Sequence, residues 1–215
     1  MKAGALWRLL AAICLLLLLS LPAAAQVLYE NGPINGQTDA WTINFGFVVP
    51  DTFTISTGSS TITGLAFGAW LSAGDVLQSV EVSITSEPFG GTTYFDQQVN
   101  FTQSGCFVNN YGFDVCTETG SFNGPTLNNG TYWVNLENAI SSMGDPVYWD
   151  ENSGIGCHSP GCPSQAGGGI GSIPSEAFSI LGTSSGTGTV PEPGSLVLFA
   201  GGLLASVGFF RRRIR

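Results

Sequence analysis

Hydrophobic and polar residues alternate with a period of two along the middle of the chain. The alternation is clearest in VLQSVEVSIT (76–85) and TYWVNLE (131–137). In an extended strand, alternate side chains point to the same face. The residues that share an apolar face are Val76, Val80, Val82 and Ile84 in the first segment and Tyr132, Val134 and Leu136 in the second. Both segments are predicted to be half-buried antiparallel strands.

Other segments rich in β-branched and aromatic residues are separated by clusters of Gly, Ser, Thr and Asn, which favour turns. No segment between them keeps an apolar helical period over three turns. The predicted strands are 53–56, 61–71, 76–85, 92–103, 108–119, 131–137, 147–150 and 177–181. This pattern predicts an all-β domain over residues 26–181, an antiparallel β-sandwich of jelly-roll type. The segment GTSSGTGT (182–189) is predicted to be a flexible linker.

The first 25 residues have the pattern of a secretory signal peptide. Lys2 and Arg8 supply positive charge, residues 9–19 are apolar, and alanines at 23–25 form a small-residue cleavage pattern. A transmembrane helix is the alternative, but the apolar run is short for a span. We therefore expect an exported protein whose mature chain begins at Gln26.

A second apolar segment, residues 196–210, contains no charged residue. As a helix it would be about 22 Å long at 1.5 Å per residue, shorter than the ~30 Å hydrocarbon core of a bilayer. Arg211, Arg212, Arg213 and Arg215 follow it, and positive charge is retained on the cytoplasmic side. The segment is therefore expected to insert as a single transmembrane helix for only a short time.

Two prolines flank a glutamate just before this segment, in Val190-Pro191-Glu192-Pro193. This motif, the apolar helix and the arginine cluster together resemble the PEP-CTERM sorting signal of Gram-negative bacteria, over residues 190–215. The resemblance implies recognition by an exosortase, transient anchoring in the inner membrane, and cleavage near the motif. It further implies delivery to the cell surface or to a biofilm exopolysaccharide matrix. A plain tail anchor is the alternative that the residues alone allow.

Segments between residues 50 and 182 also resemble segments that recur in exported proteins with this tail, among them ITGLAFGAWLSAGDVLQSVEVSITS and NNGTYWVNLENA. That similarity supports the β-sandwich prediction and implies no particular activity.

Charge is distributed very unevenly. All six Lys and Arg residues lie at positions 2, 8 and 211–215, whereas 14 of the 15 acidic residues lie in the predicted domain. A domain without a cation is not expected to bind nucleic acid, because nothing would neutralise the phosphates. The acidity is consistent with solubility outside the cell.

Four cysteines remain after the signal peptide: Cys106, Cys116, Cys157 and Cys162. An even number in an exported domain predicts two disulfides, with three pairings open. Proximity in the sequence favours Cys106–Cys116 and Cys157–Cys162. Zinc bound through CHSPGC (157–162) is the alternative, although the spacing fits no standard zinc finger.

Aromatic residues suggest a carbohydrate-binding module as a second function. Trp133 should point away from the apolar face of its strand, where its ring could stack on a sugar, and Trp149 and Asp150 are further candidates. The alternative is that these rings pack in the core. Asp145, Asp150 and Glu151 could supply oxygen ligands to Ca²⁺, although their spacing is not that of an EF-hand. A solvated acidic turn is the simpler interpretation.

An enzyme is not expected. The chain has no HExxH segment, and His158 is its only histidine. Residues 182–186, GTSSG, have the spacing GxSxG, but they lie in the predicted flexible linker rather than in the turn between a strand and a helix that a nucleophile elbow requires. Paired carboxylates would allow an extracellular glycan hydrolase, but a sequence cannot place two of them at the required separation. No cofactor is predicted apart from Ca²⁺. We therefore expect an exported structural or binding protein without catalytic residues.

Overall fold

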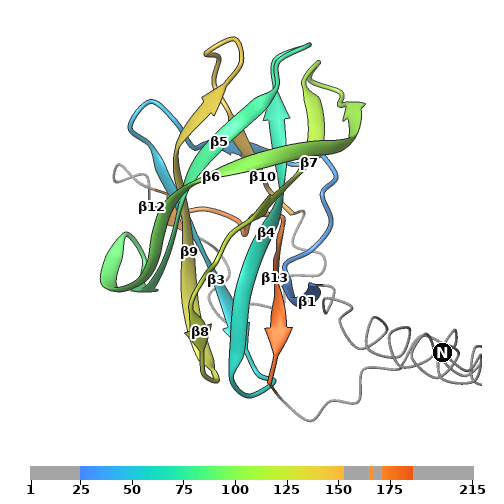
Figure 1. Ribbon diagram of the computed structural model, residues 1–215. Helices are drawn as coiled ribbons and strands as arrows, with labels where there is room; N and C mark the ends of the chain where they lie inside the picture. Colours follow the sequence, from blue (N-terminus) through green and yellow to red (C-terminus); the bar gives the residue numbers. More distant parts are fainter. Residues whose placement is uncertain (1–24, 153–164, 167–170, 186–215) are drawn as a thin grey trace, which may run out of the picture. The chain divides into compact units, whose positions relative to one another are not determined.

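The computed structural model describes residues 25–152, 165–166 and 171–185, and these form strands joined by turns and loops (Figure 1). The strands of the first half are β1 (Gln26–Glu30), β2 (Ala40–Thr42), β3 (Val48–Ile55), β4 (Ser60–Leu71), β5 (Leu77–Glu87) and β6 (Gly90–Val108). Those of the second half are β7 (Asp114–Ser121), β8 (Thr126–Leu127), β9 (Gly130–Ser141), β10 (Tyr148–Asp150), β11 (Gln165–Ala166), β12 (Gly171–Ser172) and β13 (Phe178–Ser184). The predicted all-β class is therefore confirmed.

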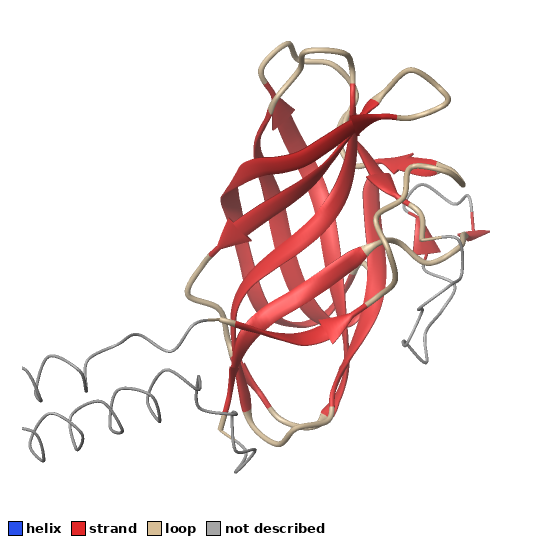
Figure 2. Ribbon diagram, turned by 90° about the vertical axis from the view of Figure 1, so that its right-hand side faces the viewer, coloured by secondary structure: helices blue, strands red, loops and turns tan. Residues whose placement is uncertain are grey.

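Eleven of these strands form a single antiparallel sheet with the order β1-β13-β4-β7-β6-β5-β9-β3, while β10 and β8 pair with β4, and β2 pairs with β10. The sheet curls strongly into a half-barrel (Figure 2). Strand β6 is the reason that two separate sheets do not form. Its first part pairs with β5 and its second part with β7, so one strand carries the ladder from one half to the other (Figure 1). The predicted sandwich is thus replaced by one continuous curled sheet.

Alternation along the strands decides which side chains face the interior. Val80, Val82 and Ile84 on β5 are fully buried, as the period-two pattern predicted. Val76 was assigned to the same face, but it precedes β5 and 45 % of its surface is exposed. At the other end of the domain, β13 continues to Ser184, so three residues predicted as linker belong to the last strand.

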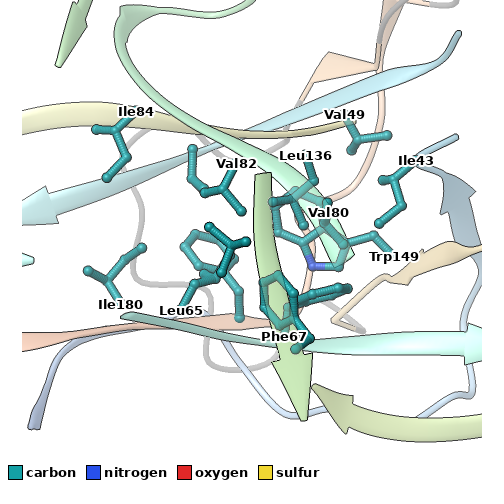
Figure 3. Close-up of a cluster of buried hydrophobic side chains, with 14 of the residues drawn as sticks. Ile43, Val49, Leu65, Phe67, Val80, Val82, Ile84, Leu136, Trp149 and Ile180 are labelled. Carbon is teal, nitrogen blue, oxygen red and sulfur yellow. The ribbon is translucent and has the colours of Figure 1, made fainter. Parts of the chain in front are cut away.

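The core lies on the concave side of the sheet. Its largest fully buried side chains include Trp149, Phe53, Phe67 and Phe178. Figure 3 shows aliphatic side chains from β5, β9 and β3 facing Leu65, Phe67, Ile180 and Trp149 across the interior. Strands β1 and β3, at the two ends of the strand order, approach each other through side chains rather than through a ladder. The rings of Tyr29 and Phe53, for example, lie 6.3 Å apart.

Candidate functional site

Several predicted functional residues lie outside the described part of the chain. They are the sorting residues Val190, Pro191, Glu192 and Pro193, the cluster Arg211, Arg212 and Arg213, and the second cysteine pair Cys157 and Cys162. Residues 1–24 of the predicted signal peptide (1–25) and the apolar segment 196–210 lie outside it too. Within the residues that are described, no helix is both long and apolar enough to span a membrane.

The disulfide predicted between Cys106 and Cys116 is present. It joins β6 to β7 close to the turn that connects them, where a bulge interrupts their pairing between Ser104 and Phe107. Both sulfurs also accept a hydrogen bond from the side-chain amide of Gln103, at 3.0 Å each. The bridge therefore fixes an irregular end of this hairpin.

Trp149 is a core residue, and its prediction as a ligand-binding residue is wrong. Its side chain is fully buried, and its indole N–H donates to the carbonyl of Ala177 at 3.1 Å. Its ring meets Phe67 and Phe178 edge to face, with centroids 6.1 and 5.5 Å apart. Trp149 therefore cannot share a binding surface with Trp133, which is half-buried and lies opposite Thr52 and Thr85 in the sheet.

The carboxylate of Asp150, which was predicted to bind a ligand, is hydrogen-bonded to the ring of Trp70 instead. Its buried carboxylate accepts the indole N–H of Trp70 at 2.6 Å and the backbone N–H groups of Asn35 and Gly36 at 2.9 and 3.1 Å. Trp70 in turn stacks on Tyr111, whose surface is 61 % exposed. Asp150 thus fixes the position of Trp70, the ring on which the exposed Tyr111 stacks.

The predicted Ca²⁺ ligands do not form a metal site. The oxygens of Asp150 are taken by the three N–H groups just described, and Oε1 of Glu151 accepts the indole N–H of Trp41 at 2.6 Å. Asp145 is half-buried, and it is its backbone carbonyl that accepts from Asn44. Over residues 25–152, 165–166 and 171–185, no group of three acidic, histidine or cysteine side chains is placed to hold a metal.

A buried polar network centred on Asp51 was not foreseen from the sequence. Oδ2 of Asp51 accepts hydrogen bonds from the Asn31 side chain, the Ser175 hydroxyl and the Glu176 backbone N–H, at 3.1, 2.7 and 2.7 Å. Oδ1 accepts the backbone N–H of Thr52 at 2.6 Å. The sequence does contain a pattern that could have predicted its burial: Asp51 lies two residues from both Val49 and Phe53, so all three side chains point to the same face of β3, which is the core face.

Two other buried carboxyl groups, those of Glu118 and Glu176, have no hydrogen-bond partner on either oxygen. Burial raises the pKa of Glu118 to about 7. Burial also raises the pKa of Asp51 to about 7, against the opposing effect of its hydrogen bonds. The pKa of Glu176 lies well above its ordinary value, because it is buried and because Asp51 and Glu151 add negative charge nearby. Such groups fold most readily in the protonated form.

A surface pocket of about 350 Å³ lies where the turn before β3 meets the end of β9. Its lining comprises Asn44, Phe45, Asn138, Ala139, Ile140, Ser141 and Gly144. Phe45 and Asn138 both have left-handed backbone conformations, with φ of 57° and 49°. The segment Asn44-Phe45-Gly46 could be read as a turn from its sequence, but no sequence pattern indicates that it meets residue 138.

Comparison with known proteins finds a match at the C-terminal end of the chain. The model of the PEP-CTERM protein-sorting motif matches residues 189–213. Neither the search of curated proteins nor the search of solved structures found a significant match. The matched residues include Val190, Pro191, Glu192 and Pro193, the apolar segment, and Arg211, Arg212 and Arg213. The chain therefore carries a PEP-CTERM protein-sorting motif, the mark of an exported protein that is sorted through this segment.

Proposed function

We propose that the protein is exported through an N-terminal signal peptide and held briefly in the inner membrane by residues 196–210. An exosortase-type enzyme then cuts it near Pro191-Glu192-Pro193. The released domain acts at the cell surface or in a biofilm exopolysaccharide matrix as a structural or binding component. The match of the sorting motif to residues 189–213 carries this proposal.

Two properties of the domain support an extracellular role. The Cys106–Cys116 disulfide is typical of oxidising compartments outside the cytoplasm. Residues 9–210 contain no Lys or Arg, so the domain carries uncompensated negative charge. Net charge far from zero keeps a protein soluble and discourages adhesion to anionic surfaces and nucleic acids.

Processing is tested by the intact mass of the protein recovered from its native cells. We expect a product that begins near Gln26 and lacks Arg211, Arg212 and Arg213. The variant E192A should accumulate as a membrane-bound precursor, because the glutamate of the motif is lost. Replacing the exposed Ser185 by Ala provides the control and should leave processing unchanged. Full-length chain that stays in the inner membrane of growing wild-type cells would overturn the proposal.

Carbohydrate binding is a second candidate, favoured by aromatic rings that the fold leaves exposed. Phe45 and Tyr111 are 65 % and 61 % exposed, and Tyr111 rests on Trp70. Aromatic faces of this kind are large and rigid, and they stack on other rings and apolar faces. Retention of the purified domain on an exopolysaccharide column tests this function, and W133A tests the contribution predicted for Trp133. A domain that passes through columns of every glycan tried would exclude it.

We assign the protein no catalytic step. The four most enclosed carboxyl groups are held by the fold: Asp51 and Asp150 are hydrogen-bonded within it, and Glu118 and Glu176 are buried without a partner. Turnover of any member of a glycan panel by the purified domain would overturn this assignment in favour of a hydrolase.

A further inference from the structure

The pocket beside Phe45 is built from two loops that the fold holds together. The backbone N–H of Ala139 donates to the carbonyl of Ile43 at 3.1 Å, and the side chain of Asn44 donates to the carbonyl of Asp145 at 3.0 Å. The N–H of Val147 donates back to Asn44 at 3.3 Å. Because Asn44 is almost fully buried, it connects the two walls of the pocket. The pocket is therefore formed before any ligand arrives.

Two of the three non-glycine residues that have a positive φ in the described part of the chain line this pocket. Phe45 has φ of 57° and Asn138 has φ of 49°, and both residues line it. A left-handed conformation is unfavourable for a bulky residue such as phenylalanine, which is a genuine outlier there, whereas Asn tolerates it better. Each strained residue costs of order 1–3 kcal/mol, and such residues cluster at ligand sites.

The ring of Phe45 gains little from the fold in return for this strain. Its surface is 65 % exposed, and Ile140 beside it is 51 % exposed. Glycine would relieve the strain at position 45, and it would also remove an apolar ring from water. What distinguishes Phe45 from other exposed phenylalanines is that its ring lines the pocket, where it is available for contact with a ligand.

From these observations we propose that the Phe45 pocket binds a sugar unit of an uncharged polysaccharide. This proposal rests on carbohydrate binding as the function and names the site and the ligand class. Phe45 and Ile140 supply the apolar surface for the C–H face of a sugar ring. Asn138 supplies its amide oxygen as an acceptor for a sugar hydroxyl, because its NH₂ group donates to Glu81. The volume of about 350 Å³ is at the lower end of the range for small-molecule pockets, about 300–1,000 Å³.

The charges around the pocket select against anionic sugars. The side-chain amide of Asn138, which lines the pocket, donates to Glu81 at 2.7 Å and approaches Glu137 at 3.5 Å. Two carboxylates therefore lie next to this lining residue. Residues 9–210 contain no Lys or Arg to offset them. Carboxylates accept hydrogen bonds from sugar hydroxyls but repel uronic acids and sulfated sugars. The ligand class is therefore a neutral glycan.

The variant F45G separates a binding role from a structural one. Glycine adopts the left-handed conformation at no steric cost, so F45G should unfold at the same temperature as the wild type or at a higher one. Its affinity for neutral glycans should fall by about tenfold or more, the scale of losing one stacked ring. Binding is measured by calorimetry with cellohexaose, maltohexaose and chitohexaose, and with a polygalacturonate oligosaccharide as the anionic comparison.

Phe89 offers a matched control. It is also a left-handed phenylalanine, with φ of 60° and 48 % of its surface exposed, but it is not part of the pocket. F89G should therefore resemble F45G in its effect on stability and should leave glycan affinity unchanged. Equal losses of affinity in F45G and F89G would contradict a specific site at Phe45.

The remaining outcomes distinguish the site from the function. If the wild type binds none of the neutral glycans, both the site and carbohydrate binding are overturned. If it binds one of them and F45G binds equally well, the Phe45 pocket is overturned while the function stands, and W133A then tests the other ring. A lower unfolding temperature for F45G would show that the ring is structural and would also overturn the proposal.

Discussion

Oδ2 of Asp51 accepts a hydrogen bond from the backbone N–H of Glu176 at 2.7 Å, although the two residues are 125 positions apart in the chain. Asp51 lies on β3, at one end of the strand order, and Glu176 lies two residues before β13, which is near the other end. The side chain of Asn31, just after β1, joins the same oxygen at 3.1 Å. A buried carboxyl group thus connects the two ends of the curled sheet, where no ladder of backbone hydrogen bonds does.

We expect the variant D51N to unfold about 2–3 kcal/mol more easily than the wild type, because one oxygen becomes an NH₂ group. At pH 5 the carboxyl group of Asp51 is protonated, and its hydroxyl oxygen can donate to Ser175 and still accept an N–H group, whereas an NH₂ group only donates. The NH₂ group must then face the N–H group of Thr52 or Glu176, and that buried donor is left without an acceptor. Chemical denaturation at pH 5 measures the change. Asp114 is the control, since it accepts only the exposed N–H of Gly74, and D114N should cost less than about 1 kcal/mol. Equal effects of D51N and D114N would contradict the role of Asp51.

The stability of the domain should fall as the pH rises from about 4 to about 7. The pKa values of Asp51 and Glu118 are raised to about 7 in the folded protein, from 3.8 and 4.5, and the pKa of Glu176 is raised well above its ordinary value. Between these limits the folded state binds more protons than the unfolded state, so each rise in pH favours unfolding. Unfolding temperatures measured across this range provide the test, and a maximum near neutral pH would contradict it.

The variant E118Q isolates the contribution of one of these groups. Glu118 is opposite Gln103 in the ladder of β6 and β7, and the buried Oε1 of Gln103 has no partner either. A protonated carboxyl or an amide at position 118 can donate a hydrogen bond, but a carboxylate cannot. E118Q should therefore match the wild type near pH 4 and exceed it by about 2–3 kcal/mol near pH 8. An unchanged pH profile would show that Glu118 does not titrate in this range.

Truncation of the two tryptophans should have unequal effects. W149A removes a fully buried ring and the hydrogen bond to Ala177, and it should lower the free energy of unfolding by about 3–5 kcal/mol. W133A removes a half-buried ring from the convex face and should cost about 1 kcal/mol. Denaturant titration of both variants measures the difference, and a larger cost for W133A would contradict the burial described here.

The disulfide should contribute about 2–3 kcal/mol, because Cys106 and Cys116 close a short loop in the unfolded chain. The double variant C106S/C116S should lose this amount, and addition of a reductant should not destabilise it further. The wild type should respond to the reductant by the same amount. If the wild type and the double variant unfold at the same denaturant concentration, the bridge has no stabilising role.

The positions of many strands follow from local pattern. The alternation of Val80, Val82 and Ile84 predicted a buried face because extended backbone fixes where every second side chain points. Proximity in the sequence predicted the bond between Cys106 and Cys116, which lie on neighbouring strands of one hairpin. The sorting motif could also be recognised from the sequence, because its proline, apolar and arginine elements follow one another within residues 189–213.

Properties that depend on distant residues were decided only by the tertiary structure. The sequence around Trp149 did not predict that its ring would pack in the core against Phe67 and Phe178. It also did not predict that the carboxylate of Asp150 would accept a hydrogen bond from Trp70. The network at Asp51 and the pocket at Phe45 each join segments that lie far apart in the chain. Local sequence determines which way a side chain points along its own strand, whereas the curl of the sheet determines what that side chain meets.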